Sequence, residues 1–222
     1  MAKVGIEKRS MGDEAVRAKT GKGWDEWFKV LDELGIEKSH QERARFLAAE
    51  HGLSGWWSQS VTVEYERARG LREINQKCSG DFEVSVSRAI AVPVAKAFAA
   101  FAEAGQMDRW FSSKTEQDFR VGGRYRNADG DSGEFRVIVP NGRIRFTWEQ
   151  KQHEPGSVVE VRFYEKGASK CQVVLQHSKL ANQKEVEDLR EGWSWAMDSL
   201  RSYLETGKAI KFEEWKTGKL GE

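Results

Sequence analysis

The hydrophobic residues of this 222-residue chain change their spacing near residue 80. Before that point they recur every three to four residues, as on one face of a helix. After it they alternate with polar residues, as in a half-buried strand, most clearly over 82–86, 144–148 and 171–177. From residue 183 to residue 205 the helical spacing returns. The pattern therefore predicts helices, then an antiparallel sheet, then one long helix.

The first part of the chain, residues 1–75, predicts an all-α bundle of three or four helices. Residues 24–34 place Trp24, Trp27, Phe28 and Leu31 on one face. Residues 39–42 have the form of a capping box, which starts the next helix. Another helix is expected over 55–69. Residues 71–80 are polar and without period, which is typical of a linker.

Residues 80–206 predict a second domain of class α+β. Its order is strand, helix after Pro93, short helix, about six strands and the long helix. Turn dipeptides such as Asp129-Gly130 and Asn141-Gly142 separate the strands. We expect a curved antiparallel sheet of about seven strands around the C-terminal helix, with a cavity between them. Residues 207–222 are expected to form a charged tail.

The charge balance bears on partners and compartment. The 36 basic and 35 acidic residues nearly cancel, so we do not expect nucleic acid as a partner. Cys78 and Cys171 form no CxxC pair, which favours a reducing, cytoplasmic compartment. The first residues carry no signal peptide pattern, and no apolar run is long enough to cross a membrane.

Bulky aromatic residues are abundant, with nine Trp and eleven Phe, and they supply the candidate binding site. Their positions in the expected strands and helices let them line the space between sheet and helix, or simply fill it as core. Trp148, Trp193 and Met197 are expected nearest its centre. The full candidate set for a ligand cavity is Phe98, Phe101, Trp110, Phe111, Phe119, Tyr125, Phe135, Phe146, Trp148, Phe163, His177, Trp193 and Met197.

Few residues suggest other chemistry. His177 ends the last strand on its inward phase, either as a ligand anchor or base or as a histidine satisfied by its neighbours. The four His residues lack zinc spacing, and residues 129–134 lack the register of a calcium loop. We therefore expect no metal, no cofactor and no catalytic residue.

Several stretches resemble a known superfamily: 88–98 (RAIAVPVAKAF), 108–111 (DRWF), 121–125 (VGGRY), 144–148 (IRFTW) and 173–177 (VVLQH). They are similar to the START-related SRPBCC superfamily, whose fold is the helix-grip. Within it, they look most like the C-terminal domain of the activator of the heat-shock-protein-90 ATPase. Residues 20–28 (TGKGWDEWF) and 51–57 resemble a bacterial helical domain of unknown function.

The resemblance implies a cavity for small apolar ligands or a protein-interaction module, and it carries over no catalytic residue. We prefer a non-catalytic cytoplasmic protein, monomer or homodimer, that holds a small hydrophobic molecule or lipid. One alternative is a co-chaperone-like module that activates a chaperone ATPase. Another is a cyclase or hydrolase that uses His177 with Glu149 or Glu160. The last is a DNA-binding regulator that uses residues 44–69, with Ser58, Gln59 and Thr62 on the reading helix.

Overall fold

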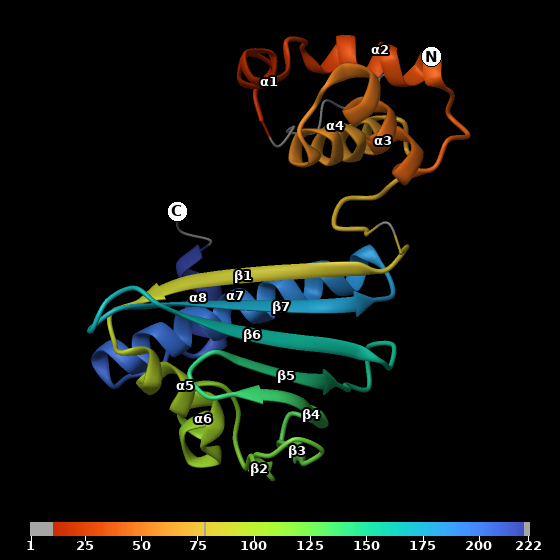
Figure 1. Ribbon diagram of the computed structural model, residues 1–222. Helices are drawn as coiled ribbons and strands as arrows, with labels where there is room; N and C mark the ends of the chain where they lie inside the picture. Colours follow the sequence, from red (N-terminus) through yellow and green to blue (C-terminus); the bar gives the residue numbers. More distant parts are fainter. Residues whose placement is uncertain (1–10, 78, 220–222) are drawn as a thin grey trace. The chain divides into compact units, whose positions relative to one another are not determined.

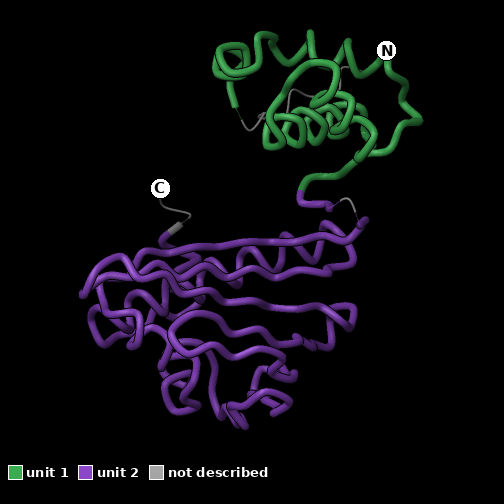
Figure 2. The backbone as a smooth tube through the Cα atoms, viewed as in Figure 1, with its two compact units in different colours: residues 1–74 green, residues 75–222 purple. Residues whose placement is uncertain are grey.

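The computed structural model of the protein describes residues 11–77 and 79–219. The chain divides into two compact units, residues 1–74 and 75–222 (Figure 2). Cys78 lies outside the described residues, and Cys171 is buried in the C-terminal unit. Among the described residues, no helix combines the length and hydropathy that crossing a bilayer requires.

The N-terminal unit consists of helices, as predicted (Figure 1): α1 (Asp13–Thr20), α2 (Trp24–Leu34), α3 (His40–His51) and α4 (Gly55–Ala68). The predicted capping box is confirmed, because Ser39 accepts from the Glu42 amide while the Glu42 side chain accepts from the Ser39 amide. The buried side chains form one core from all four helices: Val16, Trp24, Trp27, Phe28, Leu31, Leu47, Leu53, Val61 and Tyr65.

The C-terminal unit has the predicted α+β architecture (Figure 1). Its sheet has the order β1-β7-β6-β5-β4-β3-β2, and every neighbouring pair is antiparallel. The strands are β1 (Phe82–Ile90), β2 (Glu116–Gln117), β3 (Arg124–Arg126), β4 (Ser132–Val139), β5 (Arg143–Trp148), β6 (Ser157–Glu165) and β7 (Cys171–Leu180). The helices are α5 (Val94–Ala102), α6 (Ala104–Trp110), α7 (Gln183–Thr206) and α8 (Phe212–Lys219).

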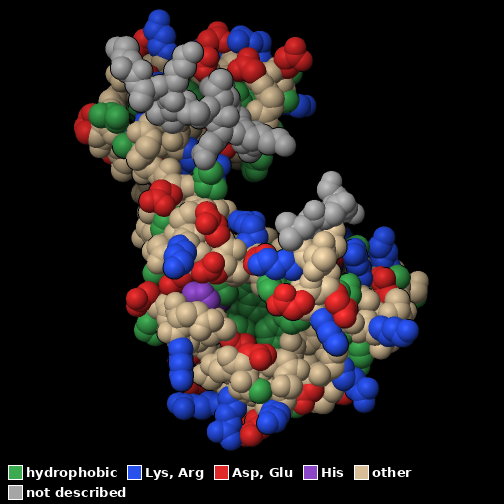
Figure 3. All heavy atoms as spheres, turned by 180° about the vertical axis from the view of Figure 1, so that it is seen from behind, with side chains coloured by type: hydrophobic (Ala, Val, Ile, Leu, Met, Phe, Trp, Pro, Cys, Tyr) green, Lys and Arg blue, Asp and Glu red, His purple; other side chains and the backbone are tan. Residues whose placement is uncertain are grey.

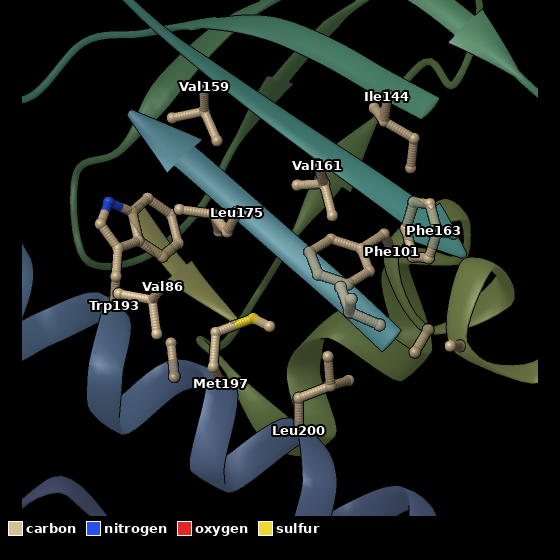
Figure 4. Close-up of a cluster of buried hydrophobic side chains, with 14 of the residues drawn as sticks. Val86, Phe101, Ile144, Val159, Val161, Phe163, Leu175, Trp193, Met197 and Leu200 are labelled. Atoms are coloured by element: carbon tan, nitrogen blue, oxygen red, sulfur yellow. The ribbon is translucent and has the colours of Figure 1, made fainter. Parts of the chain in front are cut away.

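The long helix α7 lies across one face of the sheet and supplies the centre of the core. Trp193, Met197 and Leu200 point from α7 toward side chains of the central strands, such as Val161 and Leu175 (Figure 4). Alternate residues of β6 and β7 are buried, as the period-two pattern predicts. Helices α5 and α6 cover the region between β1 and the short strands.

Two glycines allow close backbone packing around β3, Gly123 in the turn before it and Gly133 of β4, opposite Tyr125. A Cβ atom on Gly133 would lie 1.9 Å from the Thr147 carbonyl oxygen, and one on Gly123 would lie 1.9 Å from the Asp118 carbonyl oxygen. Only glycine fits where backbones approach this closely. This arrangement places Tyr125 next to the last residues of β5, where the Tyr125 hydroxyl donates to the Thr147 carbonyl over 3.0 Å.

Residues 208–219 pack on α7 through aromatic side chains, which the expectation of a charged tail does not include. Helix α8 packs on α7 through Phe212, whose ring meets Trp195 edge-on at 5.6 Å. The Trp195 indole donates to the Ile210 carbonyl over 2.7 Å, and the Trp215 indole donates to Asp198 over 3.0 Å. One aromatic pair in so short a segment is too weak a pattern to predict a helix.

Candidate functional site

An apolar hollow of about 40 Å³ lies between the sheet and helices α6 and α7. A cavity needs about 10–15 Å³ of such space to hold one water molecule, so the hollow has room for only a few small groups. Among its lining residues are eight of the predicted set: Phe101, Trp110, Phe111, Tyr125, Phe135, Phe146, Trp148 and Trp193. Met107, Thr115, Gln117, Asn127 and Ile144 complete it.

The other candidates lie elsewhere in the interior. Met197 and His177 are fully buried, and the ring of Phe98 contacts those of Phe163 and Phe119 at 5.4 and 6.0 Å. None of these five lines the hollow. Residues of β3–β5 contribute much of the hollow's lining, whereas four of these five side chains are buried in the core and Phe119 packs against it while partly exposed.

A wider mouth of about 350 Å³ adjoins the hollow and shares Phe111, Trp148 and Trp193 with it. Figure 3 shows a hollow on this unit with hydrophobic side chains at its bottom and a histidine and acidic side chains near its edge. The remaining lining residues are Asp129, Asp131, Gln150, Gln152, His153, Asp188, Leu189, Gly192 and Trp195.

Aromatic rings form the wall between hollow and mouth. Phe111, directly after α6, lies parallel to the Trp193 ring, with centroids 5.7 Å apart and planes 4° apart. Trp148, at the end of β5, meets Trp193 edge-on at 5.0 Å. Phe111 also stacks on Trp195, which α8 holds in place. A flat apolar group would find faces and edges of rings on several sides here.

Several buried polar atoms around these rings have no hydrogen-bond partner among the described residues. They are Asp131 Oδ1, Trp148 Nε1 and His153 Nδ1, which belong to mouth residues, and Thr115 Oγ1 of the hollow. A buried polar group without a partner costs about 1–3 kcal/mol. Such groups therefore mark a place where a ligand or ordered water completes the bonding.

Asp131 is held firmly despite that free oxygen. It follows the turn between β3 and β4, and its Oδ2 accepts from the Asn127 side-chain amide over 3.0 Å. Its own backbone amide donates to Asn127 Oδ1 over 3.0 Å. Burial raises the pKa of Asp131, and the nearby Asp129 charge adds to this effect, although the Asn127 hydrogen bond opposes it.

His177 has both ring nitrogens occupied, in agreement with the satisfied alternative. The Trp193 indole donates to Nδ1 over 3.0 Å, so Nε2 carries the proton and donates to Ser157 Oγ over 2.8 Å. Ser157 in turn donates to the Trp148 carbonyl over 3.0 Å. Burial, with a smaller effect from His153, lowers the pKa of His177 to about 3, so the ring is neutral.

The carboxylates considered as partners of His177 point elsewhere. Glu160 lies between the inward residues Val159 and Val161 of β6 and pairs with Arg143 over 3.8 Å. Glu149 is exposed and lines a separate open groove of about 770 Å³ on the outer side of β2–β5. That groove is lined mostly by charged residues, some already paired, such as Arg126 with Glu116 over 2.7 Å.

The sequence analysis missed the polar part of the site. Asp131 and His153 lie in turns, where polar residues usually face water, and no pattern around Thr115 points to a ligand. Trp195 is two residues from Trp193 on a helix, so the helical period does not place it on the same face. The one available signal was the second aspartate of the 129–131 turn, which a hairpin alone does not require.

A seven-stranded open antiparallel sheet holding one long C-terminal helix, with an aromatic pocket between them, defines a helix-grip domain. The model of the family described as "Activator of Hsp90 ATPase homolog 1-like protein" matches residues 91–205, and the chain belongs to this family. A domain of unknown function, DUF4287, matches residues 10–67. Both agree with the predicted resemblances.

Solved structures share the fold of the C-terminal unit. The crystal structure of CalU16 from Micromonospora echinospora is 23% identical, with a TM-score of 0.52, and covers 57% of this chain and 78% of its own. The Aha1 dimer from Colwellia psychrerythraea is 17% identical, with a TM-score of 0.52, and covers 57% and 98%. These identities establish the fold alone. A search of curated proteins found no match.

Proposed function

We propose that the C-terminal unit binds a small, mainly aromatic molecule at the mouth, with its apolar part against Phe111, Trp148 and Trp193. The observation that carries this proposal is the set of buried, unpartnered polar atoms beside an aromatic wall: Asp131 Oδ1, Trp148 Nε1 and His153 Nδ1. A folded protein rarely leaves such atoms without a partner.

The size and lining of the mouth support this proposal. Its volume of about 350 Å³ lies within the ~300–1,000 Å³ of typical small-molecule sites. The deeper hollow is almost filled by side chains, so the ligand would rest at the mouth and insert at most a small group. A carrier that encloses a long lipid chain between sheet and helix is therefore disfavoured.

Gly192 offers a direct test. It lies on α7 in the lining of the mouth, and a Cβ atom built there meets no atom within 4 Å. In Gly192→Leu the new side chain would occupy the mouth, while the helix gains from losing a glycine. Gly105→Leu is the matched control, because Gly105 is an equally unobstructed glycine in α6 that lines none of the pockets described above.

The probe is N-phenyl-1-naphthylamine, a neutral aromatic dye whose fluorescence rises in apolar sites. We expect the wild type and Gly105→Leu to bind it with the same affinity, and Gly192→Leu to bind it at least tenfold more weakly. Thermal unfolding would confirm that both variants are folded. Equal binding by all three proteins would reject the mouth as the site. Native mass spectrometry of the freshly purified protein would identify a ligand that copurifies.

A second candidate is activation of a chaperone ATPase, which the family description favours. The open charged groove beside β2–β5 would then be the docking surface, with Arg124 and Arg136 among its basic residues. We expect the full chain to stimulate ATP hydrolysis by a purified Hsp90, and Arg124→Glu to weaken this. Lys170→Glu, at an exposed position outside the groove, is the control. Absence of stimulation would reject this candidate.

A further inference from the structure

The charges around the mouth are one-sided. Three aspartates line it, Asp129, Asp131 and Asp188, and the described lining residues include no Lys or Arg. Asp129 and Asp188 are exposed, whereas Asp131 is 3% exposed and has an unpartnered Oδ1. The buried, unpartnered carboxylate oxygen is the observation that distinguishes this group from an ordinary acidic surface.

We propose that the ligand of the mouth is an aromatic amine in its protonated form, whose ammonium group binds Asp131 while its ring lies against Phe111, Trp148 and Trp193. This inference rests on the proposed function and narrows it to one ligand class. It disfavours fatty acids, phosphate esters and other anions, which would meet three carboxylates and no Lys or Arg, with His153 the one basic side chain among the described lining residues.

Asp131 is suited to this role by its fixed geometry. The Asn127 side chain fixes the Asp131 backbone amide and donates to Oδ2, so turning the carboxylate to satisfy Oδ1 would cost the Oδ2 bond. A carboxylate oxygen needs an N–H or O–H donor, and a charged donor gives a bond roughly twice as strong as a neutral one. Burial raises the pKa of Asp131, so a cation placed beside it would also favour its ionised form.

The aromatic wall is suited to the same ligand. An ammonium group is attracted to the faces of indole rings, and Trp148, Trp193 and Trp195 all line the mouth. The Trp148 indole N–H can only donate, so it requires an acceptor on the ligand. Complete satisfaction of the site therefore calls for a hydroxyl or carbonyl oxygen on the same molecule as the amine.

Three probes with one ring system and different charges test the inference: 2-(1-naphthyl)ethylamine, 2-(1-naphthyl)ethanol and 1-naphthaleneacetate. Titration calorimetry of the full chain at pH 7 and low salt would measure each affinity. We expect the amine to bind at least about tenfold more tightly than the alcohol, in line with a charge-assisted bond, and the acetate to bind most weakly. An amine that binds no better than the alcohol or the acetate would overturn the inference.

Variants separate the ammonium contact from general charge. Asp131→Asn should reduce amine affinity to within about threefold of the alcohol and leave alcohol affinity unchanged. Asp188→Asn, at the exposed rim, should weaken the amine less than threefold, because solvent screens that charge. Asp118→Asn, on the outer groove, should change nothing. If Asp131→Asn does not fold, the ranking of the three probes on the wild type still decides the question.

The outcomes also distinguish this inference from the function on which it rests. If N-phenyl-1-naphthylamine binds and Gly192→Leu blocks it, but the amine has no advantage, the ligand class is wrong and the site stands. If neither the dye nor any of the three probes binds, both are wrong. An amine advantage that persists in Asp131→Asn would show nonspecific attraction of cations and would overturn the inference.

Discussion

Each unit of this protein holds a histidine in a polar network, partly buried for His40 and fully buried for His177, and the surroundings act on the two rings in opposite ways. In the N-terminal unit, His40 Nδ1 lies 3.1 Å from Glu66, and this hydrogen bond raises the pKa of His40. In the C-terminal unit, His177 bonds only to neutral groups, and burial lowers its pKa to about 3. The same residue type is therefore biased toward its charged form in one unit and held neutral in the other.

The difference follows from what surrounds each ring. The Glu66 carboxylate contacts Arg43, Arg72 and His40, and Arg72 Nη2 lies 2.7 Å from Glu66 Oε2. The N-terminal unit thus pairs this buried carboxylate with basic side chains. The C-terminal unit connects Trp193, His177, Ser157 and the Trp148 carbonyl through neutral donors and acceptors. Asp131 differs from both networks, because its carboxylate is buried and its Oδ1 has no hydrogen-bond partner among the described residues.

Removing the centre of the ionic network should have the largest effect on stability. Glu66→Gln leaves two buried guanidinium groups without their anion, and breaking such a group costs about 3–5 kcal/mol. Hydrogen exchange of the full chain would measure the loss of protection in α3 and α4 separately from the C-terminal unit. Glu50→Gln, at an exposed position of α3, should change stability by less than about 0.5 kcal/mol. If Glu66→Gln lowered the free energy of unfolding as little as Glu50→Gln, the ionic network would not contribute to stability as predicted.

Removing the neutral link should cost less. His177→Leu fills the volume but leaves the Trp193 indole N–H without its acceptor and Ser157 without its donor. We expect a loss of about 2–3 kcal/mol, confined to the C-terminal unit. Thermal unfolding with the same exchange measurement would check it. If His177→Leu were as stable as the wild type, the chain from Trp193 to Trp148 would contribute nothing.

Acidification should shift the two units in opposite directions. The pKa of His177 is lowered on folding, so the unfolded chain binds the extra proton and the C-terminal unit loses stability as pH falls from about 6.5 toward 3. The slope is at most about 1.4 kcal/mol per pH unit. The raised pKa of His40 has the reverse sign. The contribution of His40 to the stability of the N-terminal unit is complete below about pH 6.5, and it is lost as pH rises through the pKa of His40 in the folded protein.

Unfolding measured for each unit between pH 5 and 8 would test these signs. His177→Leu and His40→Gln are the controls, since each should remove the pH dependence of its own unit and leave the other unchanged. Below about pH 4.5 we expect a further loss of stability in the N-terminal unit. The pKa of Glu66 is lowered in the folded protein, so the unfolded chain binds this proton more readily as pH falls. A common direction for both units between pH 5 and 7 would contradict the comparison.

The smallest effect concerns a hydroxyl outside either network. Thr115 Oγ1 is buried without a partner, so Thr115→Val should change stability by less than about 0.5 kcal/mol, or increase it slightly. Ser157→Ala, which removes a hydroxyl with two partners, should cost about 1–2 kcal/mol. Chemical denaturation of the two variants side by side would sharpen the contrast between satisfied and unsatisfied groups.

The periodicity of the sequence predicts this fold well because the burial of one face dictates the spacing of apolar residues. The strands around Ile144, Val159 and Leu175 and the helix bearing Trp193 are all found where that spacing places them. The same reasoning identifies inward side chains but not where the interior is hollow. Met197 and Phe163 are inward, as expected, yet they fill the core, while Phe111 and Trp148 reach the mouth.

The polar half of the site could not be predicted for a related reason. A carboxylate in a turn is normally solvated, whereas Asp131 is buried just before β4, where a bridge between Ser132 and Glu149 brings the turn next to the end of β5. That position depends on contacts between segments far apart in the chain, which no local pattern encodes. The same holds for Trp195, whose orientation is set by the Ile210 carbonyl and the Phe212 ring.

The packing of α8 on Trp195 gives the C-terminal segment an influence out of proportion to its length. Because one wall of the mouth is an indole fixed by residues 210 and 212, changes in this short helix would reshape the opening without disturbing the sheet. Selectivity could then diverge through a peripheral helix that tolerates substitution, while the scaffold that keeps the domain folded stays constant.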